Sequence, residues 1–254
     1  MNLMRLPERI NADRGAPPWI VAQHLFRYRW ACTFTAGKRV LDAACGIGYG
    51  SHMLATEGQA QFVLGLDLAS DVIEENSRRY ASQANLKFEV GDVCDLQLPA
   101  ESFDVYTSFE TIEHVPDPLK LLQEAKRILR PGGLLLLSTP NRELTNPGKT
   151  INDRPFNPFH LREWSVSELT ELVGQVFPNY QLFVQAPFPE RYARFLAAIG
   201  RWSHWLGFRM HQLTKVLLTL VGRFPPCHVQ PPIPTHPAEV SVIWAAKSEM
   251  SRNL

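Results

Sequence analysis

A glycine-rich segment at residues 42–50 has the clearest chemical potential in this sequence. It reads DAACGIGYG and overlaps a short apolar run at residues 39–43. Glycines between a strand and a helix let a ligand approach the backbone, and the N–H groups that start the helix are then free for an anionic group. The dinucleotide-binding pattern G-x-G-x-x-G fails, because Ser51 or Met53 stands where its third glycine would lie. The segment therefore predicts a ligand-binding turn and argues against a nicotinamide-dependent oxidoreductase.

Two histidines and a glutamate supply groups that could move a proton. His114 follows the fourth predicted strand, and His160 lies beyond the fifth. An imidazole titrates near neutral pH and could accept the proton of a bound hydroxyl, a role we expect of His114 before His160. Glu113 would orient a histidine or a loop, or act itself, and the alternative role of each histidine is structural. With Glu110 these side chains could bind a divalent cation, but their spacing is not diagnostic and we expect no metal.

Alternating strands and helices must bring these groups together. Apolar periodicity predicts strands at residues 39–43, 61–67, 86–90, 103–108, 134–138, 180–185 and 239–246. Helices are predicted at residues 17–35, 51–56, 70–83, 118–129 and 165–176. Pro131-Gly132-Gly133 would stop the fourth helix, and Ser165 with Glu168 would form a capping box on the last. The alternation favours an open parallel sheet covered by helices, which binds ligands at the carboxyl ends of its strands.

Composition excludes several classes of protein. The 254 residues include 26 Lys and Arg against 25 Asp and Glu, so the basic field of a nucleic-acid-binding protein is absent and we expect no nucleic-acid partner. The four cysteines are widely spaced without a C-x-x-C pair, which indicates a reducing compartment and no disulfide framework. With no apolar leader and no run of 18 apolar residues, we expect a cytoplasmic protein.

The glycine-rich segment and several segments after it resemble, in order, the motifs of the class I S-adenosylmethionine-dependent methyltransferases. These segments are GLD at 65–67, GDV at 91–93, FDV at 103–105, RPGG at 130–133 and STPN at 138–141. ETIEHV at 110–115 and NPFHLRE at 157–163 are similar to the ubiquinone and menaquinone biosynthesis branch and to related sugar and polysaccharide methyltransferases. The resemblance implies a Rossmann-like, doubly wound α/β fold. Its seven-stranded, mostly parallel sheet would have an antiparallel last strand, with a helical insertion before it.

The resemblance also implies S-adenosylmethionine as cofactor and assigns residues to it. Asp67 would accept hydrogen bonds from the ribose hydroxyls, and Asp92 from the adenine amino group. Gly46 and Gly48 would allow close approach, while Asp42 would orient the turn or the methionyl amino group. The other expected cofactor neighbours are Ala44, Leu68, Val93 and Phe109. The first of these replaces a glycine that the family often has, and its methyl group is tolerable if the backbone φ stays negative.

The expected activity is methyl transfer to a small-molecule, sugar or lipid-linked acceptor, most readily at oxygen. The alternative is a binding or scaffold protein of the same fold without turnover. We expect an N-terminal helical segment at 1–36, the cofactor-binding domain at 37–187, an insertion at 188–237, and a last strand with its tail at 238–254. Residues 191–223 hold an apolar stripe, six Arg or Lys and no Asp or Glu. This pattern favours a lid or a homodimer face, and alternatively peripheral contact with an anionic membrane surface.

Overall fold

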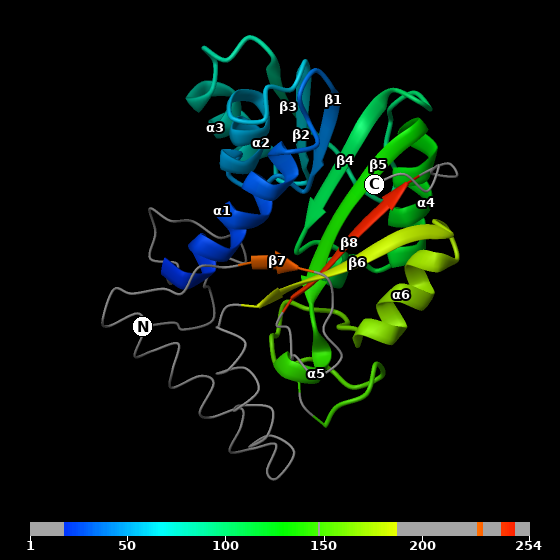
Figure 1. Ribbon diagram of the computed structural model, residues 1–254. Coiled ribbons are helices and arrows are strands. Elements are labelled where there is room, and N and C mark those ends of the chain that lie inside the picture. The colour runs from blue at the N-terminus through cyan, green and yellow to red at the C-terminus, as the bar shows by residue number, and fades with distance from the viewer. Residues whose placement is uncertain (1–17, 147, 187–227, 231–239, 247–254) are drawn as a thin grey trace, which may run out of the picture.

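The computed structural model describes residues 18–146, 148–186, 228–230 and 240–246, which form one mixed sheet with helices packed against it (Figure 1). The helices are α1 (Pro18–Cys32), α2 (Tyr49–Thr56), α3 (Ser70–Arg79), α4 (Pro118–Ile128), α5 (Arg142–Thr145) and α6 (Val166–Gly174), with a short 3-10 helix, η2, at Ile112–His114. The strands are β1 (Arg39–Ala43), β2 (Phe62–Asp67), β3 (Leu86–Val90), β4 (Phe103–Phe109), β5 (Leu129–Pro140), β6 (Asn179–Ala186), β7 (His228–Gln230) and β8 (Val240–Ala246).

The sheet has the strand order β3-β2-β1-β4-β5-β8-β6-β7. Strands β1 to β5 are parallel, and β8 runs antiparallel between β5 and β6. The chain builds outward from β1 to β3 and then returns to place β4 on the other side of β1. The strand order therefore reverses between β1 and β4, whose carboxyl ends frame the place where such sheets bind ligands. The predicted α/β, Rossmann-like architecture is confirmed, including the antiparallel last strand.

The sheet has one strand more than the seven predicted. Residues 228–230 pair antiparallel with residues 184–186 of β6 and form the edge strand β7. No strand was predicted at these residues, which are flanked by prolines in the sequence. Prolines in a sheet are confined to edges, and three residues are too few to show an alternating pattern, so the sequence could not reveal this pairing.

Strand β5 begins five residues earlier than predicted. Leu129 pairs with Phe103 directly after α4, and the register then shifts before Leu134 pairs with Val105. The Pro-Gly-Gly turn at residues 131–133 therefore lies inside β5 as an irregularity and does not separate α4 from the strand, as we had expected. The capping box of Ser165 and Glu168 is confirmed at the start of α6.

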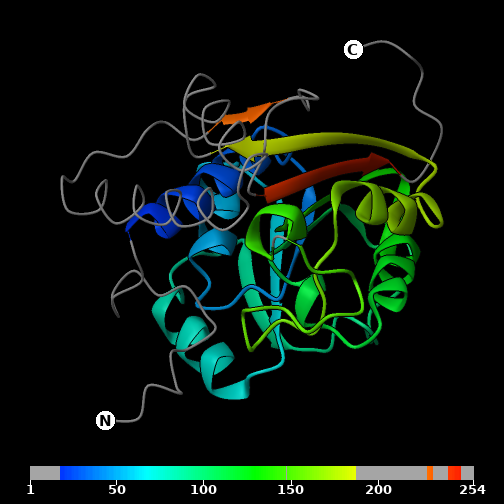
Figure 2. The ribbon, with the colours of Figure 1, turned by 90° about the horizontal axis from the view of Figure 1, so that it is seen from below.

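Two apolar cores lie on opposite faces of the sheet. Figure 2 shows α1 and α2 on one side and α4 and α6 on the other. Val40 of β1 belongs to the core under α1 and α2, and its neighbour Leu41 belongs to the core under α4 and α6. Successive side chains of a strand point to opposite faces, so covering both faces fixes the rotation of β1 and hence the direction in which the chain leaves it.

Some predictions lie outside the described residues. These are the helix at 191–223, most of the insertion at 188–237 and residues 1–17. The lid, dimer and membrane-contact hypotheses for 191–223 therefore stay predictions, as do the domain boundaries. Among the helices that the structure describes, none combines the length and apolar character needed to cross a membrane.

Candidate active site

The glycine-rich turn follows β1 and has three residues in the left-handed region. The φ angles are 61° at Ala44, 54° at Gly46 and 77° at Gly48. The condition under which the methyl group of Ala44 would be tolerable, a negative φ, is not met: the turn imposes the glycine-like conformation and the alanine adopts it at a cost of about 1–2 kcal/mol. A Cβ on Gly48 would lie 2.9 Å from the Phe88 ring, whereas at Gly46 nothing lies within 4 Å of that position. Gly46 therefore presents an open backbone surface, as close approach of a ligand requires.

Asp42 lies buried beneath the turn. Its carboxylate accepts hydrogen bonds from the hydroxyls of Ser51 (2.6 Å), Thr107 (2.8 Å) and Tyr28 (3.1 Å). Burial raises the pKa of Asp42 to about 6, although these three hydrogen bonds oppose the rise. Since no part of Asp42 is exposed, its predicted role toward the cofactor would act through the turn that it supports.

Asp67 ends β2 and binds the turn directly. One carboxylate oxygen accepts the backbone N–H of Gly46 at 3.0 Å, and the other accepts that of Ala69 at 3.0 Å. The structure therefore places the Asp67 carboxylate against the open backbone of Gly46.

The remaining predicted cofactor neighbours differ in exposure. Asp92 is exposed just beyond β3, where it accepts the backbone N–H of Cys94 at 2.8 Å. Leu68 is 69% exposed beside Asp67, so its apolar surface is open to a ligand. Val93 and Phe109 are buried, and the Phe109 ring packs edge-on against Tyr28. Because they are buried, Val93 and Phe109 pack beneath the site and add little to its surface.

Glu110 adopts a left-handed conformation (φ 54°) directly after β4. It accepts a hydrogen bond from the Ser138 hydroxyl at 2.7 Å, and a guanidinium nitrogen of Arg27 lies 3.8 Å away. Arg27 is 1% exposed and also donates to Gln185 at 2.6 Å. Sequence reasoning missed Arg27, because an arginine in α1 gives no signal that it will be buried against β4 and β6.

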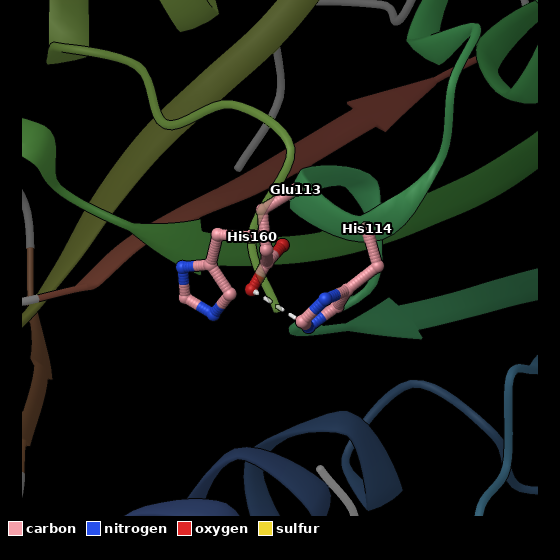
Figure 3. Close-up of side chains that lie close together, drawn as sticks. All are labelled: Glu113, His114 and His160. Atoms are coloured by element: carbon pink, nitrogen blue, oxygen red, sulfur yellow. Dashed lines mark ion pairs between the residues drawn. The ribbon is translucent and has the colours of Figure 1, made fainter. Parts of the chain in front are cut away.

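Glu113, His114 and His160, which we call the Glu–His cluster, come together although the last lies far along the chain (Figure 3). The imidazole rings of the histidines meet edge-to-face, with centroids 4.7 Å apart. The backbone carbonyl of Glu113 accepts the N–H of Leu161 at 2.9 Å, which fixes the loop after β5 against η2. Both predicted histidines and the predicted glutamate thus lie at one place, beyond the strand next to the glycine-rich turn.

Each histidine of the cluster has its Nδ1 atom fixed by an acceptor. Nδ1 of His114 lies 3.2 Å from the Phe159 carbonyl oxygen, and Nδ1 of His160 hydrogen-bonds the Glu163 carboxylate. These partners require a proton on Nδ1, so each neutral ring carries its lone pair on Nε2. Nε2 of His160 is 2.7 Å from the amide nitrogen of Asn157, an exposed side chain.

Glu163 is a site residue that sequence reasoning missed. It is 2% exposed and also accepts hydrogen bonds from Thr145 and Asn146. Burial alone would raise the pKa of Glu163, but the hydrogen bonds from His160, Thr145 and Asn146 hold it below its ordinary value. Its position three residues after His160, within the NPFHLRE segment, was the available signal.

Glu113 has the opposite electrostatic environment. Its Oε2 atom accepts the Thr139 hydroxyl at 2.9 Å, while Oε1 is buried and has no hydrogen-bond partner among the described residues. Burial, and next the negative charge of Glu110, raise the pKa of Glu113 well above its ordinary value. The nearest cationic candidate is Nε2 of His114, 4.0 Å from Oε1, which is too far for a hydrogen bond.

Comparisons with known proteins agree with this geometry. Residues 41–137 match the family model described as a methyltransferase domain. A probable S-adenosylmethionine-dependent methyltransferase of Mycolicibacterium smegmatis is 42% identical over 138 residues, which are 54% of this chain and 51% of that protein. A ubiquinone biosynthesis O-methyltransferase of Haemophilus ducreyi is 41% identical over 115 residues, which are 42% of this chain and 48% of that protein.

The fold has solved counterparts. The crystal structure of a methyltransferase from Thermotoga maritima, described as a possible histamine N-methyltransferase, aligns with a TM-score of 0.60 at 18% identity and covers 91% of this chain and 94% of that one. This likeness shows the Rossmann-like α/β fold. The domain at residues 41–137 belongs to the methyltransferase family whose model it matches, and the chain is similar to S-adenosylmethionine-dependent methyltransferases. The chain spans about half the length of the curated relatives it matches.

Proposed function

We propose that this protein transfers the methyl group of S-adenosylmethionine to a hydroxyl oxygen of a small-molecule acceptor, a class that includes sugar and lipid-linked hydroxyls. The Glu–His cluster carries the proposal. It brings two imidazoles with defined lone pairs and a buried carboxylate to the strand that neighbours the glycine-rich turn. Groups that accept protons are needed for an oxygen acceptor, because a hydroxyl must lose its proton as it attacks.

The cofactor contacts that we propose follow the carboxyl ends of three adjacent strands. Gly46 and Gly48 after β1 leave room for the methionyl part, Asp67 after β2 accepts the ribose hydroxyls, and Asp92 after β3 accepts the adenine amino group. The pairing of β1 with β2 and of β2 with β3 supports this assignment, because it aligns these ends along one edge. Leu68 offers an apolar surface to the base.

The reaction that we propose needs little covalent work from the protein. When bound, the cofactor supplies a methyl group on a sulfonium, and the C–S bond breaks with its electron pair going to sulfur. The chain orients the acceptor, excludes water and takes the hydroxyl proton at the Glu–His cluster. In our proposal His114 and His160 share that last role, and Glu163 fixes the ring of His160.

Exposed apolar side chains beside the cluster favour an acceptor with an apolar part. Phe156 is 61% exposed, Leu161 60% and Phe159 38%, and all three flank His160 in the chain. Large apolar side chains gathered at a surface commonly mark a binding site. A similar protein, from Haemophilus ducreyi, is named for an O-methyltransferase step in ubiquinone biosynthesis, which is consistent with an oxygen acceptor. Within this proposal the protein is cytoplasmic and has no nucleic-acid partner.

An acceptor screen tests the proposal. The purified protein is incubated with S-adenosylmethionine and a panel of phenols, sugars and lipid-linked alcohols, and S-adenosylhomocysteine release is measured with the mass of the product. We expect turnover with at least one hydroxyl acceptor, loss of turnover in His160→Ala, and unchanged turnover in His52→Ala. Cofactor binding without turnover on any acceptor would support the non-catalytic binding protein instead.

A further inference from the structure

The Glu–His cluster has the side-chain set of a divalent-cation site. Two imidazole nitrogens and one carboxylate oxygen offer ligand atoms that all lie within 4.8 Å of one another. Three protein ligands with an open position are the arrangement found at catalytic metal centres, where the open position takes water or substrate. We expected no metal from the sequence, because the histidines are 46 positions apart in numbering and only folding brings them together.

The outer partners of the histidines support the same interpretation. A metal-binding histidine usually donates its other ring N–H to a carboxylate or a backbone carbonyl, which orients the ring and fixes the lone pair. Here Glu163 plays that part for His160, and the Phe159 carbonyl plays it for His114. Each ring is therefore preset to offer Nε2.

A second, independent observation is the unpartnered oxygen of Glu113. Its Oε1 atom is buried without a hydrogen bond among the described residues, on a side chain that is 0% exposed. Leaving a buried carboxylate oxygen unsatisfied is destabilising, because the hydrogen bonds that it makes to water in the unfolded chain are not replaced. A cation bound between Oε1 and the histidines would remove this cost, whereas a purely structural role of the cluster gives no reason for it.

Metal binding requires the ligand atoms to move closer together, because they are spread over up to 4.8 Å. Ligand bonds of about 2.1 Å in tetrahedral geometry put neighbouring ligand atoms roughly 3.4 Å apart, and Oε1 of Glu113 is 4.0 Å from Nε2 of His114. The Asn157 amide that now contacts Nε2 of His160 belongs to an exposed side chain, which can swing aside.

We propose that Glu113, His114 and His160 bind one divalent cation of intermediate softness, such as Zn²⁺. Imidazole ligands suit this ion, whereas Mg²⁺ and Ca²⁺ prefer sites made of oxygen ligands. Cation binding does not depend on the proposed function, but the catalytic role of the cation rests on that function. The acceptor hydroxyl occupies the open position, which lowers its pKa. In this metal-bound form the imidazole lone pairs are coordinated and no longer accept the proton, so the O–H bond breaks with its proton going to water, and the oxygen electron pair forms the O–C bond as the C–S bond breaks.

Calorimetric titration of Zn²⁺ into chelator-treated full-length protein tests the site. We expect one Zn²⁺ per chain, no stoichiometric binding in His160→Ala, and binding weaker by about 10–100-fold in Glu163→Gln, which loses only the charge of the outer partner. His52 of α2, which stacks on Tyr80, provides the matched control. His52→Ala should bind Zn²⁺ as the unchanged chain does. Glu113→Gln, which keeps the size of the side chain, should also lose stoichiometric binding.

Binding of S-adenosylhomocysteine to each variant shows that it is folded. Absence of stoichiometric Zn²⁺ binding in the unchanged chain, or equal binding in all the variants, would overturn the metal proposal. Methyl transfer that persists in the chelated protein would overturn the role of the cation and leave the proposed function intact. Absence of any hydroxyl turnover together with normal Zn²⁺ binding would reject the proposed function and leave the metal site standing.

Discussion

The proposed cofactor side of the site and its proposed acceptor side are built in different ways. On the cofactor side, residues 42–50 shape the turn within one continuous segment, and two aspartates hold it: Asp42 accepts three hydroxyls, and Asp67 accepts two backbone N–H groups. On the acceptor side, residues 113–114 meet a loop more than forty residues away, and Oε1 of Glu113 stays buried without a partner among the described residues.

This difference shows what each side is prepared for. The turn keeps its shape through its own hydrogen bonds before any ligand binds, and its open backbone leaves room for a nucleoside. The Glu–His cluster has two oriented imidazole rings and a buried carboxylate oxygen without a hydrogen bond among the described residues, so a bound group is needed to satisfy that oxygen. The family match at residues 41–137 covers the turn but ends before His160, so the comparisons identify the cofactor domain and leave the acceptor to the chemistry of the cluster.

The largest expected effect is on the acceptor side. His114→Ala and His160→Ala should each slow methyl transfer by roughly 10²–10⁴-fold, because each removes a group that takes part in deprotonating the acceptor. The affinity for S-adenosylhomocysteine should stay within about twofold, since neither ring belongs to the turn. Single-turnover rates with saturating cofactor measure the first effect. Near-normal rates in both variants would remove the histidines from the reaction.

The next effect is on the cofactor side. Asp67→Ala should weaken S-adenosylhomocysteine binding by about 1–3 kcal/mol, because a charge-assisted hydrogen-bond acceptor is lost. The carboxylate also holds Gly46, so Asp67→Asn, which keeps the shape, separates turn collapse from ligand contact. Asp71→Ala, an exposed aspartate at the start of α3, serves as the control. Unchanged affinity in both Asp67 variants would exclude Asp67 from the cofactor site.

Asp42 makes the stability of the turn depend on pH. Its folded-state pKa of about 6 lies above the unfolded value, so the folded state binds the proton more tightly. The stabilisation is therefore present at low pH and lost as pH rises through about 6. Between about pH 4.5 and pH 7.5 the unfolding free energy, compared with Asp42→Asn, should fall by about 2 kcal/mol. Denaturant unfolding of both proteins checks this, and a constant difference contradicts it.

The smallest effect concerns Ala44. Replacing it with glycine relieves the left-handed strain of about 1–2 kcal/mol but costs about 0.5–1 kcal/mol of chain entropy. We expect Ala44→Gly to stabilise the fold by up to about 1 kcal/mol, measured as a shift of the unfolding midpoint. Ala43→Gly, one position earlier in β1 and buried, should destabilise it. A destabilised Ala44→Gly would mean that the methyl group makes contacts which outweigh the strain.

The sequence predicted the cofactor side better than the acceptor side for a physical reason. The turn, Asp67 and Asp92 each follow a strand directly, so short-range periodicity places them at one edge once the strands are parallel. The orientation of His160 depends on Glu163, Thr145 and Asn146, which meet only after α5 and the following loop fold. Burial of Arg27 and the positive φ of Ala44 likewise follow from packing against other elements, which no local pattern records.

Titration of S-adenosylhomocysteine into the unchanged chain, Asp67→Ala and His160→Ala addresses the division between the two sides most directly. We predict micromolar-range binding in the unchanged chain and in His160→Ala, and binding weaker by about 5–150-fold in Asp67→Ala, as 1–3 kcal/mol implies. If the chain does not bind this ligand at all, or if His160→Ala loses it as Asp67→Ala does, then the site does not consist of separate cofactor and acceptor sides.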